Sequence, residues 1–189
     1  VDLDEGDYLI GAALTDGHHD VMLFSDGGKA VRFDEADVRP MGRQARGVRG
    51  MALEDGQNVI AMLVAEDETQ SVLTATENGY GKRTPIAEYT RHGRGTKGMI
   101  AIQQSERNGR VVAATLVRAA DEIMLITDRG VLVRTRVAEI RELGRATQGV
   151  TLINLDEGAQ LCGLQRIVEN DAAVDPETDA AGESGPESS

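Results

Sequence analysis

The sequence predicts an all-β fold made of repeated small sheets, and three observations lead to that prediction. The chain repeats itself with a period of 51 residues, and a fixed period of this length indicates a modular architecture. Each unit contains short apolar runs separated by glycine-containing turns, which is typical of strands and hairpins. No stretch shows a helical period of useful length.

The repeat is clearest around a turn that occurs three times. The stretches SDGGKAVRF (25–33), TENGYGKRT (76–84) and TDRGVLVRT (127–135) align without gaps. Chance does not hold so many positions in one register, so we expect the three units to share one fold. The positions that keep their residue in all units are Gly28/Gly79/Gly130, Arg32/Arg83/Arg134, Gly42/Gly93/Gly144, Arg43/Arg94/Arg145 and Gly47/Gly98/Gly149.

Four strands are expected in each unit. In the first unit, YLIGAAL (8–14) and VMLFS (21–25) are apolar, and a turn at 26–28 leads into KAVRF (29–33). The second unit has Asn78-Gly79 at this turn, a strong hairpin signal because both residues tolerate positive φ. About four short strands are the content of one propeller blade. The last strand of each unit follows a glycine-rich stretch, at GVRGMAL (47–53), GMIAI (98–102) and GVTLI (149–153).

The repeat also predicts the domain organisation. We expect one β domain over residues 1–167, with Val1 to Asp4 ending a preceding repeat, so that the chain is part of a larger array. Residues 168–189 are acidic and poor in large apolar side chains, and they cannot bury enough apolar area to offset their ordering entropy. We therefore predict a disordered acidic tail there. The expected units are about 6–55, 56–107 and 108–157, with a stub at 158–167.

Composition indicates a cytoplasmic protein. The chain has 189 residues and a net charge of −12, and its acidic start, VDLDEGD, resembles neither a signal nor a transit peptide. No apolar run has the length of a membrane span. The single cysteine, Cys162, excludes an internal disulfide, and we expect it to be a small buried residue beside Leu161 and Leu164.

Positive charge is segregated by the repeat. The windows 29–49, 80–100 and 131–151 hold 15 of the 20 Lys and Arg but only 6 of the 32 acids. Equivalent positions of successive blades lie around one rim, so these windows predict a discontinuous basic stripe. Lys and Arg side chains can replace the counterions condensed on a DNA phosphate backbone, and release of those counterions favours binding. The neighbouring glycines let the phosphates approach main-chain N–H groups closely. Alternatively, these cations could form a solvated surface with salt bridges. The three copies at the same offset favour the DNA-binding interpretation over this alternative.

The stripe predicts duplex DNA as the ligand, because no aromatic residues interleave the cations as they do in single-strand binders. The predicted DNA-binding residues are Lys29, Arg32, Arg39, Arg43, Arg46, Arg49, Lys82, Arg83, Arg91, Arg94, Lys97, Arg134, Arg136, Arg141 and Arg145.

Several stretches resemble a known family. DVMLFSDGGKAVRF, ATENGYGKRT, ITDRGVLVRTRVAEI and GRATQGV are similar to the C-terminal domain of the bacterial DNA gyrase A protein, over Val1 to about Ile167. The resemblance implies a β-pinwheel, a propeller-like disc whose blades exchange strands and whose basic rim wraps duplex DNA. It also implies a role in ATP-dependent negative supercoiling by a holoenzyme of two gyrase A and two gyrase B chains in the bacterial cytoplasm and nucleoid.

The family's hallmark box, QRRGGKG, is absent, and degenerate versions stand at MGRQARG (41–47), HGRGTKG (92–98) and LGRATQG (143–149). The full domain usually has six blades, so this chain resembles its later half. Two alternatives stay open: the C-terminal DNA-binding domain of topoisomerase IV, which has the same blade, and a propeller that serves as a protein-interaction platform.

We expect no catalytic site in this chain. In gyrase, the cleavage tyrosine and the ATPase lie elsewhere, so no cofactor is expected here, and ATP and Mg²⁺ serve the rest of the holoenzyme. Tyr8, Tyr80 and Tyr89 are interpreted as packing residues. His18 and His19, with Asp16 and Asp20 nearby, could capture a divalent metal, but we interpret TDGHHD as a solvated hairpin loop and predict no metal site.

Overall fold

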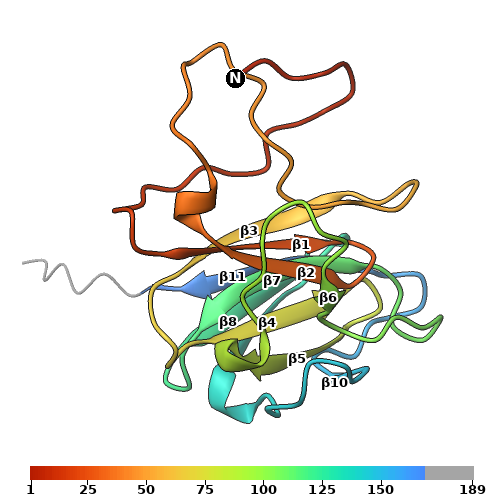
Figure 1. The fold of residues 1–189 in the computed structure, drawn as a ribbon. Coiled ribbons are helices and arrows are strands. Elements are labelled where there is room, and N and C mark those ends of the chain that lie inside the picture. The colour runs from red at the N-terminus through yellow and green to blue at the C-terminus, as the bar shows by residue number, and fades with distance from the viewer. Residues whose placement is uncertain (169–189) are drawn as a thin grey trace, which may run out of the picture.

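The computed structural model describes residues 1–168 and confirms the all-β prediction (Figure 1). Three antiparallel hairpins form its centre: β1 (Asp20–Ser25) with β2 (Lys29–Asp34), β4 (Ser71–Thr76) with β5 (Tyr80–Pro85), and β8 (Glu122–Thr127) with β9 (Leu132–Arg136). A single-turn 3-10 helix follows each hairpin: η1 (Glu35–Asp37), η2 (Ile86–Glu88) and η3 (Val137–Glu139). The predicted acidic tail lies outside the described residues, apart from Val168. No helix within residues 1–168 is long and apolar enough to cross a bilayer.

The hairpin turns depend on glycine, as the Asn78-Gly79 signal predicts. Gly79 has a φ of 83°, in the left-handed region. A Cβ atom at this position would lie 2.6 Å from the carbonyl oxygen of Ile153. Glycine is therefore required both for the backbone conformation and for the close approach of the following unit.

Each sheet combines strands from two successive units. β3 (Val59–Ala65), β7 (Val111–Val117) and β11 (Leu161–Ile167) pair with β1, β4 and β8 of the unit before them. The two-residue strands β6 (Met99–Ile100) and β10 (Val150–Thr151) pair with β2 and β5 in the same way. The resulting sheets have the orders β3-β1-β2-β6, β10-β5-β4-β7 and β11-β8-β9. The first two contain the four strands that the sequence predicts for a blade, and the strand exchange implied by the family resemblance is present.

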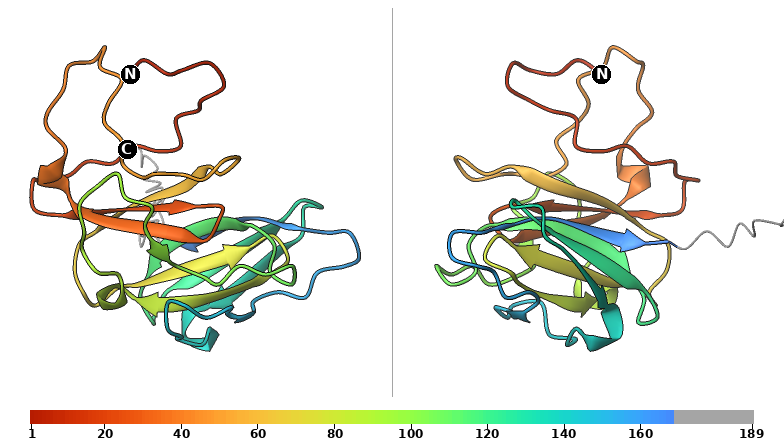
Figure 2. Two further views of the ribbon diagram at one scale, coloured as in Figure 1. Left: turned by 45° about the vertical axis from the view of Figure 1, so that its right-hand side comes forward. Right: turned by 180° about the vertical axis from the view of Figure 1, so that it is seen from behind.

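Two strands predicted for the first unit do not form. Residues 8–14 adopt no regular structure and are exposed, with 85% of Tyr8 accessible, so the packing role expected for Tyr8 was wrong. Residues 47–53 form only an isolated bridge between Met51 and Thr96. Their equivalents in later units pair with the hairpin of the unit before, and the described chain has no such hairpin for the first unit. In Figures 1 and 2 the chain before β1 loops out above the stacked sheets, whereas Met51 returns to pack against Val31 and Phe33 of β2.

The core lies between neighbouring sheets. Val72 faces the first sheet, in a cluster with Met22, Phe24 and Tyr89, while the adjacent Leu73 faces the third sheet. Consecutive residues of a strand point to opposite faces, so all six residues of β4 are buried. The Phe24 and Tyr89 rings meet edge to face, with centroids 5.9 Å apart. Stacking against a neighbour on each face therefore buries β4 along its whole length.

Cys162 is exposed, contrary to our expectation that it is buried. The pairing of β11 with β8 shifts register between Leu161 and Gly163, which leaves Cys162 as the extra residue of a bulge. A bulged residue is not held in the alternation of the strand. The side chain of Leu161 is buried instead.

Candidate nucleic-acid interface

Three glycine-rich segments, here called corners 1, 2 and 3, carry part of the exposed positive charge, at Arg43, Arg46, Arg49, Arg94 and Lys97. They comprise residues 41–50, 92–98 and 143–149, and each follows a 3-10 helix. Corners 2 and 3 lead into the outer strands β6 and β10. Gly149 has a φ of 81°, and a Cβ atom there would lie 2.5 Å from the carbonyl oxygen of Gly81. This glycine lets corner 3 pass directly over the hairpin of the unit before.

Successive corners contact one another along one edge of the molecule. The N–H of Gly95 in corner 2 donates to the carbonyl of Gly50 in corner 1, at 2.6 Å. Just beyond corner 2, the N–H of Gln103 donates to the carbonyl of Thr147 in corner 3, at 2.9 Å. Corner 2 thus contacts corner 1 directly, and corner 3 contacts the chain just after corner 2.

Equivalent arginines hold corners 2 and 3 in place. Arg94 donates through Nε to the carbonyl of Asp37 at 3.0 Å and through Nη1 to that of Arg49 at 3.2 Å. Arg145 makes the same two contacts one unit later, to the carbonyls of Glu88 at 3.3 Å and Ile100 at 2.6 Å. In each case the arginine satisfies carbonyl groups of the preceding unit.

Arg32, a predicted DNA-binding residue, is buried instead. Its Nε atom lies 2.6 Å from the Asp20 carboxylate, and its Nη1 donates to the carbonyls of Ile86 and Tyr89 at 3.1 and 3.2 Å. The equivalent Arg83 donates to the carbonyl of Ile140 at 2.8 Å. Arg32 and Arg83 therefore each join a hairpin to the 3-10 turn of the next unit, which gives these two in-register arginines a structural role.

Lys82 is also a predicted DNA-binding residue that is fully buried. Its ammonium donates to the carbonyl of Gly144 at 2.6 Å, to the hydroxyl of Thr147 at 3.2 Å and to the carbonyl of Arg145. Burial lowers the pKa of Lys82 to about 8. The equivalent positions in the other units are Val31 and Val133, so this internal cation is a special feature of the contact between the second hairpin and corner 3.

The lowered pKa of Lys82 predicts a pH-dependent stability. Between pH 8 and 10 the unfolded chain binds more protons at this lysine than the folded chain, so the free energy of unfolding should rise with pH. We expect it to rise by about 2 kcal/mol more in the parent protein than in Lys82→Met. Urea unfolding at both pH values measures the difference, and equal pH slopes for the two proteins would contradict it.

The remaining candidates fall into two groups. Within residues 1–168, the side chains of Arg39, Arg43, Arg49, Lys97 and Arg141 are exposed and make no hydrogen bond or ion pair. Other exposed candidates already have acidic partners: Arg46 lies 3.1 Å from Asp4, Arg91 contacts Asp20 and Asp34, and Arg134 and Arg136 contact Glu122. Lys29 is half-buried in the first hairpin.

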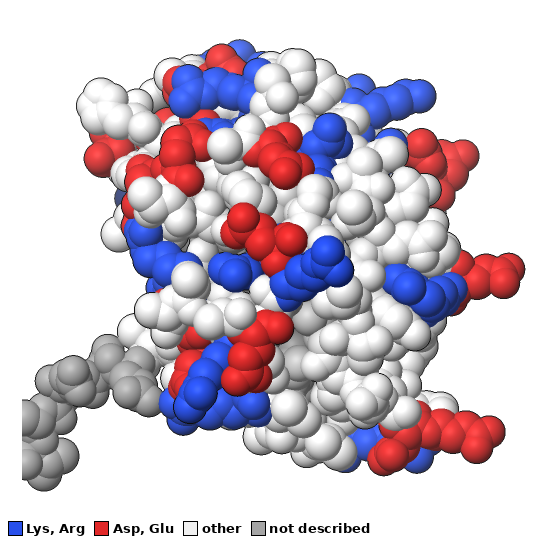
Figure 3. Space-filling view, turned by 90° about the horizontal axis from the view of Figure 1, so that it is seen from below, with Lys and Arg blue, Asp and Glu red and all other residues white. Residues whose placement is uncertain are grey.

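Acidic side chains interrupt the positive charge. Figure 3 shows that Lys and Arg alternate with Asp and Glu on the face it presents, without one continuous basic patch. The cations without acidic partners are therefore the part of the stripe that is most available to a polyanion.

Sequence reasoning missed a second repeated contact between units. The turn acids Asp26, Glu77 and Asp128 each accept the main-chain N–H of the next unit, at 3.0, 2.9 and 2.9 Å. Their spacing of 51 residues was the signal that could have revealed them. These carboxylates hold the chain just before β3, β7 and β11, so their role is structural. None of the three acids lies in a corner.

The comparisons with known proteins agree with this architecture. The family model described as "DNA gyrase C-terminal domain, beta-propeller" matches residues 19–66, 70–118 and 121–167. The chain is 54% identical over 185 residues to the DNA gyrase A protein of Pseudomonas aeruginosa, a match that covers 96% of this chain and 20% of that protein. It is 53% identical over 169 residues to the DNA gyrase A protein of Escherichia coli K12, covering 89% and 19%. The chain thus spans about a fifth of the length of these relatives.

Solved structures lead to the same family. A DNA gyrase A C-terminal domain superposes with a TM-score of 0.82 at 28% identity, over 89% of this chain and 57% of that one. A C-terminal domain of DNA topoisomerase IV superposes with a TM-score of 0.83 at 24% identity, over 88% and 52%, which shows the shared fold alone. With three repeats matched by the family model and relatives at more than half identity, the chain belongs to the DNA gyrase C-terminal domain family.

Proposed function

We propose that this chain binds duplex DNA along the row of corners and wraps it around the edge of the stacked sheets. The observation that carries the proposal is the set of exposed cations in and beside the corners that have no acidic partner within residues 1–168: Arg39, Arg43, Arg49, Lys97 and Arg141. A cation without a carboxylate neighbour can exchange condensed counterions for phosphate contacts at little cost. The glycines beside these cations keep the main chain accessible to the duplex.

The binding should follow the DNA backbone and not the base sequence. The only helices in the described residues are single 3-10 turns, and none has the length to read base edges in the major groove. Phosphate contacts position a protein on DNA but carry no sequence information directly. The proposed surface is therefore suited to bending a duplex over several blades.

We further propose that the chain acts within the DNA gyrase A protein. There, wrapping would present a chosen DNA segment to the rest of the enzyme and support ATP-dependent negative supercoiling. The cleavage tyrosine, the ATPase and the Mg²⁺ site would belong to the remainder of gyrase A and to gyrase B, in a complex of two copies of each in the bacterial cytoplasm. The relatives at 53–54% identity, all named as gyrase A proteins, favour this assignment over topoisomerase IV.

A salt titration of duplex binding tests the proposal. For the complete chain, we expect the logarithm of the association constant to fall steeply and linearly with the logarithm of salt concentration, by about 0.9 for each phosphate neutralised. Duplexes of unrelated sequence should give the same slope. A protein-interaction platform would instead show weak binding with a shallow slope, and a strong preference for one sequence would also contradict the proposal.

A further inference from the structure

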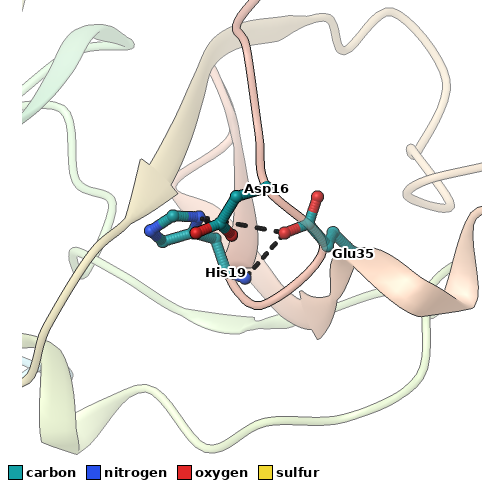
Figure 4. A group of neighbouring side chains, drawn as sticks. All are labelled: Asp16, His19 and Glu35. Carbon is teal, nitrogen blue, oxygen red and sulfur yellow. Dashed lines mark hydrogen bonds and ion pairs between the residues drawn. The ribbon is translucent and has the colours of Figure 1, made fainter.

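Three ligand-type side chains meet where the N-terminal segment enters the first sheet (Figure 4). The Oδ1 atom of Asp16 lies 2.9 Å from Nδ1 of His19, and the Oε1 atom of Glu35 lies 3.8 Å from the same nitrogen. One ligand atom from each residue falls within 4.8 Å of the others. Asp16 and His19 precede β1, whereas Glu35 opens η1 after β2, so the cluster closes the open end of the first hairpin.

The histidine nitrogen at the centre of this cluster has carboxylate neighbours but no hydrogen-bond partner. Nδ1 of His19 is buried and accepts or donates no hydrogen bond, although the Asp16 oxygen lies so near. An unprotonated nitrogen and a carboxylate oxygen at this distance present lone pairs to one another, and a positive group between them removes that repulsion. The alignment is poor for an N–H···O bond, whereas a metal ion can accept both lone pairs at once.

Main-chain groups hold both carboxylates in position and in their charged form. Asp16 accepts the N–H of His18 at 3.0 Å, and this bond lowers the pKa of Asp16. Glu35 accepts the N–H of His19 at 2.7 Å. A hydrogen bond from the Thr15 side chain, together with that N–H, lowers the pKa of Glu35. The cluster therefore carries two negative charges at neutral pH, which a divalent cation would neutralise.

The cluster is not a by-product of the repeat. At the equivalent place in the second unit, Asp67 accepts the N–H of Thr69 just as Asp16 accepts that of His18. Asp67, however, forms an ion pair with Arg118 at 2.7 Å. Gln70 and Ile86 stand where the first unit has His19 and Glu35. Of the first two units, the ligand set is thus present only in the first. In the second unit, where His and Glu are replaced, the equivalent Asp67 pairs with an arginine instead.

We propose that Asp16, His19 and Glu35 bind a divalent transition-metal ion such as Zn²⁺. One imidazole nitrogen and two carboxylate oxygens form a ligand set that zinc and cobalt accept, with bonds of about 2.0–2.2 Å. Ligands joined to one ion at such distances lie roughly 3 Å apart when adjacent, close to the present spacing of Asp16 and His19. Water completes the coordination. Imidazole favours these ions over Mg²⁺ and Ca²⁺, which prefer oxygen ligands alone.

The ion would fasten the N-terminal segment to the first hairpin. Asp16 and His19 are the ligands on residues 1–19, which form no strand before β1. Glu35 follows directly after the last ladder pair, Asp20 with Asp34. In the second and third units, the strands β3 and β7 precede the hairpin and restrain the chain there. A metal ion that joins residues 16–19 to Glu35 would replace part of that restraint in the first unit. Binding to the folded state should then stabilise the domain in proportion to the ion concentration.

The test uses the complete 189-residue chain after treatment with a chelator. Co²⁺ binding is followed by its visible absorption, and Zn²⁺ binding by calorimetry and by the rise in Tm. We expect one ion for each chain, with affinity lowered on the order of tenfold or more in His19→Gln and Asp16→Asn. His18→Gln, which changes the adjacent exposed histidine, is the matched control and should bind like the parent.

Three results would overturn the proposal. The first is no Co²⁺ or Zn²⁺ binding at millimolar ion. The second is equal binding by the parent and by His19→Gln, which would place the ion elsewhere. The third is equal loss in His18→Gln and His19→Gln. Glu35→Gln serves as a further ligand variant, and circular dichroism of each protein without metal separates the loss of a ligand from the loss of the fold.

Discussion

Replacing Arg32 with methionine is expected to lower the free energy of unfolding by about 3 kcal/mol or more. Asp20, which is 4% exposed, would lose one of its two arginine partners and keep only Arg91. The carbonyl groups of Ile86 and Tyr89 would lose their shared donor between the first and second units. Uncompensated polar groups in the interior are costly because water cannot replace the missing partner.

Arg134→Met is the matched control for Arg32→Met. Arg134 occupies the same position two units later and pairs with Glu122, but about half of its side chain is exposed. Exposed ion pairs contribute little, so this change should cost less than about 1 kcal/mol. Urea unfolding of both variants, with the slope compared to detect altered compactness, gives the two values. Similar losses for Arg32 and Arg134 would show that burial at the joint between units does not determine the cost.

The triple variant Arg43→Gln, Arg49→Gln and Lys97→Gln is expected to lose most of its affinity for duplex DNA. If each side chain neutralises one phosphate, the salt slope should fall by about 2.7, and the affinity at low salt by about 100-fold or more. Stability should stay within about 1 kcal/mol of the parent because these side chains are exposed. Fluorescence anisotropy at several salt concentrations measures both the affinity and the slope.

The control for the triple variant removes the same charge outside the corners. Arg110, Arg129 and Arg166 lie beyond the three corners, and their replacement with glutamine changes the net charge equally. If binding depended on net charge alone, both triple variants would lose affinity to the same extent. A larger loss in the corner variant is the result that supports a localised DNA path, and a normal salt slope in that variant would refute it.

The arginines show where sequence reasoning about the site succeeds and where it stops. The period predicts that equivalent basic segments of successive units lie near one another, and hydrogen bonds join corner 1 to corner 2 and the chain after corner 2 to corner 3. The in-register arginines, however, serve two different purposes. Arg32 joins units inside the molecule, while Arg43 is exposed, and both keep the same spacing in the sequence.

The sequence by itself determined the period, the hairpins with their glycine turns, and the all-β class, because these depend on residues near one another in the chain. Tertiary structure alone decided burial and pairing, because the partners come from another unit or another element. Lys82 is buried by carbonyls 62 and 63 residues away, and Arg32 by carbonyls 54 and 57 residues away. Residues 8–14 have the composition of a strand but no neighbouring hairpin within the described chain with which to pair. Glu35 joins His19 only because β1 and β2 fold back on each other, which brings the two ends of the hairpin together.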